Sequence, residues 1–286
     1  MKFELTDEQV ALGEALTDVL RAGDATAVAR AWAAGDTSPG EALWTKVADL
    51  GVTALVAPED QGGLGGSLVD LAVAFEVLGH ELAVGPWIES AALAPQVDGS
   101  MVTAAAPPLA PYAADAGVAR LLSGTAGARH ASIDSTRTLT EVTGADPFDA
   151  ASLDRAVLAC AAELVGAGER VLADSVTYVK QRKQFGREIG SYQAIKHQLA
   201  DVRIALDFAR PLVMGAALGE VPVSAAKVYA AGAAHRAART GLQVHGAIGY
   251  TAEFDLSLWL NRIRALVTAW GTPAYHRGRV LDGLVG

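Results

Sequence analysis

The sequence lacks the features that mark several large classes of protein. It holds a single cysteine, Cys160, among 286 residues, which excludes an intrachain disulfide framework and cannot by itself build a zinc site. Hydrophobic residues make up 51% of the chain, yet no uninterrupted apolar run approaches the roughly 18 residues that a membrane-spanning helix needs. We therefore expect a chain with no membrane span, and the single cysteine fits a reducing cytoplasm.

Positive charge is also scarce. The chain carries 23 Lys and Arg against 32 Asp and Glu, a formal net charge of -9, and nothing in it resembles a long basic stripe. General binding to the phosphate backbone of a nucleic acid is therefore not expected. The opening residues lack the basic region and the continuous apolar stretch of a signal peptide, so we interpret them as mature sequence.

The histidines do not indicate a metal site. His197 and His245 lie nearest the motifs described below, and neither has a second histidine at metal-ligand spacing beside it. A lone histidine in a helix is more often a hydrogen-bonded structural group than a ligand. We predict no metal.

The first third of the chain is predicted to be helical. Thr6 is a plausible N-cap, because two acidic residues follow it and apolar residues then recur at helical spacing. Residues 1–86 therefore form a predicted N-terminal helical domain. Its helices are expected at residues 5–35, 41–50 and 67–82.

The character of the sequence changes twice after this region. Residues 87–149 contain prolines, alanines and short alternating runs, which favour short strands and predict a reduced β-like middle segment. Residues 150–286 return to a helical period and predict a C-terminal helical bundle. Its helices are expected at residues 152–181, 190–218, 222–246 and 253–268.

Three separate segments resemble the acyl-CoA dehydrogenase family. They read VAPEDQGGLGGSLVDLAVAFEVLGHELA, YVKQRKQFGREIGSYQAIKHQLADV and GLQVHGAIGYTAEFDLSLWLNRIRAL. The second is the most specific, because it matches the family's RxxFG segment followed by a glutamine-containing helix. The resemblance implies a mainly α fold, with an N-terminal helical domain, a middle β domain and a C-terminal four-helix bundle that carries FAD between subunits. It also implies oxidation of an acyl-CoA thioester, with electrons passing to an acceptor flavoprotein.

The chemistry of these motifs suits a flavin dinucleotide. The planar guanidinium of Arg182 can donate two hydrogen bonds to a pyrophosphate, Phe185 can lie against a ring, and Gly186 permits a turn that a Cβ would block. Alternatively, Arg182 belongs to a solvated basic face, Phe185 lies in the core, and the glycines only end helices. By resemblance, the FAD contacts are Arg182, Phe185, Gly186, Gln193, Gln243, Gly246 and Thr272.

The catalytic base of the family is missing from its usual place. The reaction removes a proton next to the thioester carbonyl, so a carboxylate must lie opposite the flavin ring. The matching segment here places Trp270 where the family's glutamate would fall, and tryptophan cannot accept the proton. Asp154 is a substitute candidate by resemblance, although an aspartate at a helix start is more often a cap or a partner of the helix dipole. Glu163, in a very apolar stretch, is a poorer candidate, and a pair with a base across the bundle is the equal alternative for it.

The middle segment is too short for the full β domain that normally covers the flavin. This resembles the shortened subunits of heteromeric acyl-CoA dehydrogenases of sterol side-chain degradation, and the segment from Asp134 to Arg137 is similar to such subunits. The resemblance implies a second family subunit as partner, or self-association. The principal hypothesis is an FAD-dependent subunit. The alternative hypotheses are a non-catalytic structural subunit of the same family and, beyond it, a helical binding protein or an enzyme of another reaction class.

Overall fold

The N-terminal helices form much as their sequence predicts. A computed structural model describes residues 4–285. Thr6 caps the first helix in a capping box, because its side chain accepts from the Gln9 amide while the Gln9 side chain accepts from the Thr6 amide. The single helix predicted over residues 5–35 is wrong, since the chain breaks at Asp24, which has a left-handed φ of 48°. The helices are α1 (Asp7–Ala22), α2 (Ala25–Ala33), α3 (Ser38–Ala48) and α4 (Leu68–His80).

The middle of the chain contains short strands, as predicted, but it begins with a helix. Residues Ile88–Leu93 form a π-helix, η3, that packs against the bundle, so the expectation of strands there is wrong. Every residue of this segment is buried, and a short buried apolar run does not by itself distinguish a strand from a helix. Three strands then form an antiparallel sheet in the order β2-β5-β4, and two more form a parallel pair, β1 and β3. The strands are β1 (Val102–Thr103), β2 (Tyr112–Ala114), β3 (Arg120–Leu121), β4 (Thr125–Ala131) and β5 (Thr138–Thr143).

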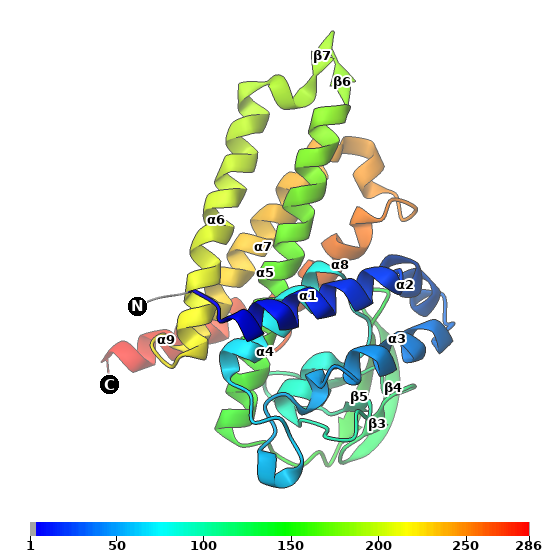
Figure 1. The fold of residues 1–286 in the computed structure, drawn as a ribbon, viewed down its shortest axis with the longest axis vertical. Coiled ribbons are helices and arrows are strands. Elements are labelled where there is room, and N and C mark those ends of the chain that lie inside the picture. Colours follow the sequence, from blue (N-terminus) through cyan, green and yellow to red (C-terminus); the bar gives the residue numbers. More distant parts are fainter. Residues whose placement is uncertain (1–3, 286) are drawn as a thin grey trace.

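The C-terminal region is helical, and the four predicted blocks are confirmed. A two-stranded hairpin joins the first two of these helices, and Figure 1 shows it projecting at the far end of α5 and α6. A last helix, α9, was not expected from the sequence, because its apolar period is weak and only His276 in it is buried. The elements are α5 (Ala150–Gln181), β6 (Lys183–Gln184), β7 (Arg187–Glu188), α6 (Gln193–Ala217), α7 (Val223–His245), α8 (Leu256–Thr268) and α9 (Pro273–Val285).

Two glycines let the N-terminal region and the bundle share one core. Gly79 of α4 faces the backbone of Glu163, and Gly166 of α5 faces the backbone of Glu76. A Cβ at either glycine would overlap the facing carbonyl, so α4 and α5 approach more closely than larger residues allow. One continuous cluster of buried apolar side chains therefore runs from α1 to α8.

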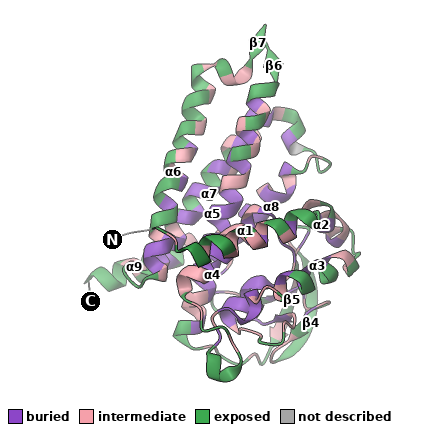
Figure 2. Ribbon diagram, viewed as in Figure 1, coloured by how far each residue is buried: buried purple, intermediate pink, exposed green. Residues whose placement is uncertain are grey.

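The far end of the bundle is much less covered than its base. Figure 2 shows buried residues concentrated where α5 and α7 meet the N-terminal helices, and exposed residues along the outer face of α6 and over the β6–β7 hairpin. None of the helices within residues 4–285 is long and apolar enough to cross a membrane.

Candidate active site

A cavity of about 680 Å³ lies between the β2-β5-β4 sheet, the π-helix η3 and the end of α8. Most of its wall is apolar, which suits an acyl group. Three charged side chains, Glu89, Arg137 and Arg264, interrupt this wall. Apolar residues of the wall include Leu109, Ile133, Leu139, Val267 and Trp270.

Glu89 is the most perturbed carboxyl group in this cavity. Its side chain is 2% exposed, and its Oε1 accepts a hydrogen bond from Arg137 at 3.3 Å. Burial raises the pKa of Glu89 to about 7, against the opposing charge of Arg137. Its Oε2 accepts no hydrogen bond from any residue in the described part of the chain. This residue was missed from the sequence, although a glutamate inside the apolar run WIESAAL was a signal that could have found it.

A second buried arginine, Arg262, ties the middle segment to the bundle. Arg262 donates to Asp134, to Glu163 at 2.8 Å and to the Thr136 hydroxyl at 2.8 Å. It also donates to the Ala83 carbonyl at 3.1 Å. Burial alone would raise the pKa of Asp134, but the charge and hydrogen bonds of Arg262 outweigh it and lower that pKa. The predicted alternative for Glu163, a pair with a base across the bundle, is confirmed.

The turn that carries Trp270 is held rigidly at the cavity. Trp270 is 1% exposed and has a left-handed φ of 56°. His276 Nε2 lies 2.8 Å from the Trp270 carbonyl oxygen, and His276 Nδ1 lies 2.9 Å from the Ser224 hydroxyl. Burial lowers the pKa of His276, which favours a neutral ring that donates to the carbonyl and accepts from the hydroxyl. The Gly271 amide also donates to the Leu109 carbonyl, at 3.0 Å.

Asp154 lies at the protein surface and is not a helix cap. The N-cap of α5 is Asp149, whose side chain accepts from the Ser152 amide, so the cap interpretation of Asp154 is wrong. Its side chain is 36% exposed and pairs with Arg279 of α9 at 2.8 Å. Asp154 is not among the residues that line the cavity beside Trp270.

The residues expected to contact FAD near the RxxFG motif are strongly exposed. Arg182 ends α5, and its amide donates to the Tyr178 carbonyl at 2.9 Å. Phe185 is 92% exposed with a φ of 52°, so the alternative that places it in the core is wrong. Gly186 has a φ of 80°, and a Cβ there would meet nothing within 4 Å. The end of α5 therefore presents an exposed arginine, and the tip of the hairpin that follows presents an exposed aromatic ring.

The remaining predicted contacts lie at helix ends. Gln193 is the exposed first residue of α6, and Gln243 is exposed in the last turn of α7. Gly246 follows α7 with a φ of 62°, and a Cβ there would meet nothing within 4 Å. Thr272 is exposed, and its hydroxyl accepts from the Tyr275 amide at 3.2 Å in the first turn of α9. Thr272 thus has a capping role whether or not it meets a cofactor.

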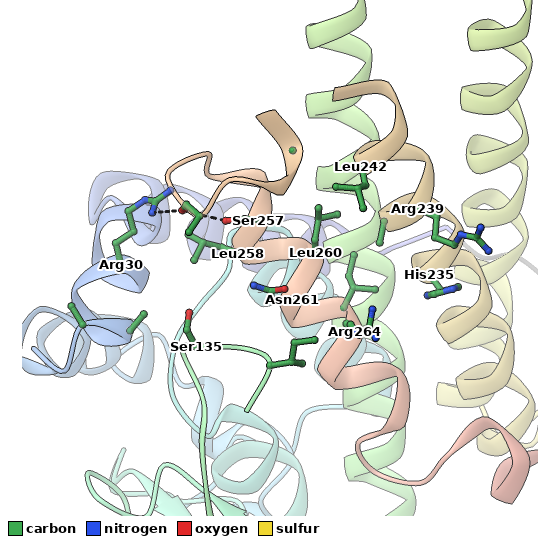
Figure 3. A pocket seen from close by; sticks show the side chains of 17 residues that line it. Arg30, Ser135, His235, Arg239, Leu242, Ser257, Leu258, Leu260, Asn261 and Arg264 are labelled. Atoms are coloured by element: carbon green, nitrogen blue, oxygen red, sulfur yellow. Dashed lines mark hydrogen bonds between the residues drawn. The ribbon is translucent and has the colours of Figure 1, made fainter. Parts of the chain in front are cut away.

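A shallow groove runs along α7 and α8 and joins the cavity to the end of α7. Its central part has a volume of about 630 Å³ and shares Ile133, His235 and Arg264 with the cavity. Figure 3 shows His235 and Arg239 of α7 near Asn261 and Arg264 of α8 along this groove. A further recess continues from His235 and Arg239 to Gln243. Cationic side chains therefore follow the whole path, which suits an anionic ligand such as a phosphate.

Comparison with protein families gives two matches that together cover most of the chain. Residues 6–124 match the acyl-CoA dehydrogenase N-terminal domain, and residues 148–285 match the acyl-CoA dehydrogenase C-terminal domain. Among curated proteins, the chain is 32% identical to acyl-CoA dehydrogenase IpdE2 of Mycobacterium tuberculosis, over 90% of this chain and 91% of that protein. It is 31% identical to acyl-CoA dehydrogenase IpdE2 of Mycolicibacterium smegmatis, over 81% of this chain and 84% of that protein.

Solved structures show the same fold. Butyryl-CoA dehydrogenase from Megasphaera elsdenii superposes with a TM-score of 0.84 at 20% identity, covering 100% of both chains. A chain of the ChsE4-ChsE5 complex from Mycobacterium tuberculosis superposes with a TM-score of 0.81 at 22% identity, covering 99% of both chains. The Tcur3481-Tcur3483 steroid ACAD superposes with a TM-score of 0.79 at 22% identity, covering 98% of this chain and 99% of that one.

Proposed function

The chain belongs to the acyl-CoA dehydrogenase family, and on that premise we propose that it is one subunit of an FAD-dependent enzyme that desaturates an acyl-CoA thioester between its α and β carbons. The flavin site is shared with another subunit. The observation that carries this proposal is the distance, within this chain, between the cavity beside Trp270 and Arg182, which is expected to contact the pyrophosphate of FAD.

The length of α5 sets that distance. The Ala269 carbonyl, next to Trp270, lies 3.9 Å from the Cys160 sulfur of α5. Arg182 ends the same helix, so the 1.5 Å rise per residue places it about 33 Å further along. One extended flavin dinucleotide does not span this distance. A flavin ring in the cavity and a pyrophosphate on Arg182 therefore belong to two different flavins, each completed by another chain.

The exposed surface near the hairpin supports such an assembly. Phe185 is 92% exposed, and Ile204 and Phe208 of α6 are 53% and 62% exposed. Ile204 and Phe208 are one turn apart on the same face of α6, and large exposed apolar side chains of this kind are typical of a protein–protein interface. We propose a second subunit of the same family as the partner, with self-association as the other possibility. One solved relative, the ChsE4-ChsE5 complex, is named for two different chains.

The roles of the residues follow from this arrangement. When bound, FAD supplies the acceptor for the hydride that leaves the β carbon. Arg182, Gln243 and the open backbone at Gly246 would hold the pyrophosphate and adenosine part of a flavin, as would Phe185, Gly186 and Gln193 in the family pattern. Thr272, two residues after Trp270, lies at the cavity end and would contact the other flavin. A carboxylate must remove the α proton, and Trp270 cannot. Because Asp154 is paired with Arg279 at the surface, we propose that the partner supplies this base. Electrons then pass to an acceptor flavoprotein.

A structural subunit is the second candidate function. The observation that favours it is Trp270, which occupies the position of the family's base and is packed rigidly there. In that case the chain completes the flavin site of its partner without turning over substrate in its own cavity. Under either function we expect the chain in a reducing cytoplasm, because its single cysteine cannot form an intrachain disulfide. A bulky acyl group, of the steroid-derived type named for one solved relative, fits the cavity volume.

Turnover measurements on purified assemblies test this proposal. The chain is expressed alone and with a family partner from the same organism, and acyl-CoA oxidation is followed with an artificial electron acceptor. We expect FAD and turnover in the coexpressed assembly and little of either in the chain alone. Substituting the partner's base while retaining this chain should abolish turnover under either function, and residual turnover would contradict the proposal that the partner supplies the base. The number of acyl-CoA molecules bound separates the two functions: one thioester per chain indicates that this chain's own cavity takes substrate, whereas one per pair of chains favours a structural role.

A further inference from the structure

The cavity beside Trp270 is lined by a glutamate, Glu89, one of whose carboxylate oxygens has no hydrogen-bond partner among residues 4–285. The Glu89 side chain is 2% exposed, and its Oε1 accepts from Arg137. Its Oε2 is buried and accepts no hydrogen bond from any other residue within 4–285. A buried acceptor without a donor destabilises the folded state, so an oxygen left in this way is suited to a hydrogen bond from a ligand.

The backbone holds Glu89 firmly in this position. It lies in the π-helix η3, where the Ala94 amide donates to the Glu89 carbonyl at 3.0 Å. Arg155 of α5 fixes the same helix by donating to the Ala92 carbonyl at 3.0 Å. π-helical turns are rare and often occur at functional sites. The backbone at Glu89 is therefore well defined, and its side chain is held by burial and by the contact with Arg137.

The charge balance around Glu89 allows it to act as donor or acceptor. Arg137 is the cation beside Glu89 and Asp115, while Arg262 is already engaged with Asp134 and Glu163. The buried cluster thus holds more carboxyl groups than guanidinium groups. Burial raises the pKa of Glu89 to about 7 and also raises that of Asp115. Near neutral pH, Glu89 exchanges between a carboxyl group that donates and a carboxylate that accepts.

The surroundings of this pair are apolar, as Leu109, Leu139 and Val267 illustrate. A plain hydrocarbon chain in the cavity would leave Oε2 unpaired, whereas an oxygen-bearing group would satisfy it. We propose that Glu89 and Arg137 form a binding subsite for a hydroxyl or ketone oxygen on the acyl group, so that the substrates are oxygen-bearing acyl-CoA thioesters and not plain alkyl ones. This inference rests on the proposed function, because it takes the cavity as the acyl site.

Binding of three matched thioesters to the complete assembly tests the subsite. The probes are cyclohexylacetyl-CoA and its 4-hydroxy and 4-oxo derivatives, and their Kd values are measured by calorimetry under anaerobic conditions. We expect at least one of the two oxygenated thioesters to bind about tenfold more tightly than the unsubstituted one. Equal Kd values for all three would overturn the subsite. Comparing the three Kd values needs only the parent protein. The comparison therefore tests the proposal even if a substitution at Glu89 prevents folding.

Two variants test whether Glu89 causes the tighter binding of oxygenated thioesters. Glu89→Leu should reduce the preference for the oxygenated thioester to within about twofold, while Glu89→Gln should keep most of it, because the amide both donates and accepts. Glu220→Leu is the matched control, since it removes an exposed carboxylate in the turn before α7. An unchanged preference in Glu89→Leu would overturn the proposal.

Measurements of turnover distinguish failure of the subsite from failure of the proposed function. They also test whether Glu89 is itself the group that accepts the proton. Preferential binding without any desaturation would contradict the proposed function and leave the subsite standing. If Glu89→Gln lowered turnover of all three thioesters by about a hundredfold or more with unchanged Kd values, Glu89 would be the proton acceptor and the subsite would be overturned.

Discussion

Tyr178 of α5 and His245 of α7 stack with their ring centroids 4.2 Å apart. The His245 ring is fixed further by a hydrogen bond from Nδ1 to the Gly241 carbonyl at 2.8 Å, and burial lowers its pKa. Tyr178 lies one turn before Arg182, and Gly246 directly follows His245. The stack therefore joins the two helix ends that carry the proposed FAD contacts, and it does so with a structural histidine of the kind predicted from the sequence.

Arg182→Ala should weaken FAD retention by the assembled protein. A charged, bidentate contact to pyrophosphate contributes on the order of 1.5 to 3 kcal/mol, which corresponds to roughly ten- to a hundredfold in Kd. Lys183→Ala is the matched control, because it removes the adjacent exposed cation of the same hairpin. Equal losses in the two variants, measured by flavin titration, would indicate a general basic face in place of a specific contact.

Asp154→Asn should leave turnover close to that of the parent assembly. The carboxylate pairs with Arg279 at a partly exposed position, and such surface pairs contribute about 0 to 1 kcal/mol to stability. Steady-state kinetics and thermal unfolding check both quantities. A loss of turnover of about a hundredfold or more, with FAD still bound, would identify Asp154 as the base and contradict the proposal that the partner supplies it.

Arg262→Met should destabilise the fold strongly. Removing this guanidinium leaves the carboxylates of Asp134 and Glu163 buried without a cation, and breaking a buried pair in this way costs about 3 to 5 kcal/mol. Arg264→Met, on the same helix but exposed, should change the free energy of unfolding by less than about 0.5 kcal/mol. Urea unfolding of both variants measures the difference. Similar small changes in the two would show that the network contributes little to the fold.

Glu89→Gln should alter the pH dependence of stability. Because the pKa of Glu89 is raised from 4.5 to about 7 in the folded state, the folded parent binds more protons than the unfolded chain between these values. Parent stability therefore falls as pH rises through this window, by up to about 3 kcal/mol from this group. The variant lacks this titration, so its free energy of unfolding should rise relative to the parent between pH 5 and pH 8. Parallel pH profiles would contradict the assigned pKa.

Local patterns predicted much of the fold. The capping residue Thr6, the helix start at Ser67 and the four blocks of the bundle depend on neighbours within a few residues, and the sequence displays these directly. The break at Asp24 was missed because an apolar period continues across it. The π-helix at residues 88–93 was missed because its apolar composition suits a buried strand equally well.

The candidate site was predicted only in part, because its geometry depends on contacts between distant residues. Glu163 and Arg262 are 99 positions apart, and no local period indicates that they meet. Trp270 was recognised from the sequence as a replacement for the family's glutamate. The hydrogen bond from His276 to the Trp270 carbonyl could not be predicted, because it depends on where α9 packs. The motif residues from Arg182 to Gly246 were found by resemblance, and their role at an interface with another chain stays a prediction.

The central claim of the proposed function is that this chain binds FAD only when it is assembled with another chain. The most direct measurement is the FAD content per chain, from visible absorbance, combined with the mass of the same sample from light scattering. We predict little or no FAD in monomers and FAD in assemblies of two or more chains, with Arg182→Ala reducing that content. A monomer that retains one FAD per chain and oxidises acyl-CoA would contradict the proposal.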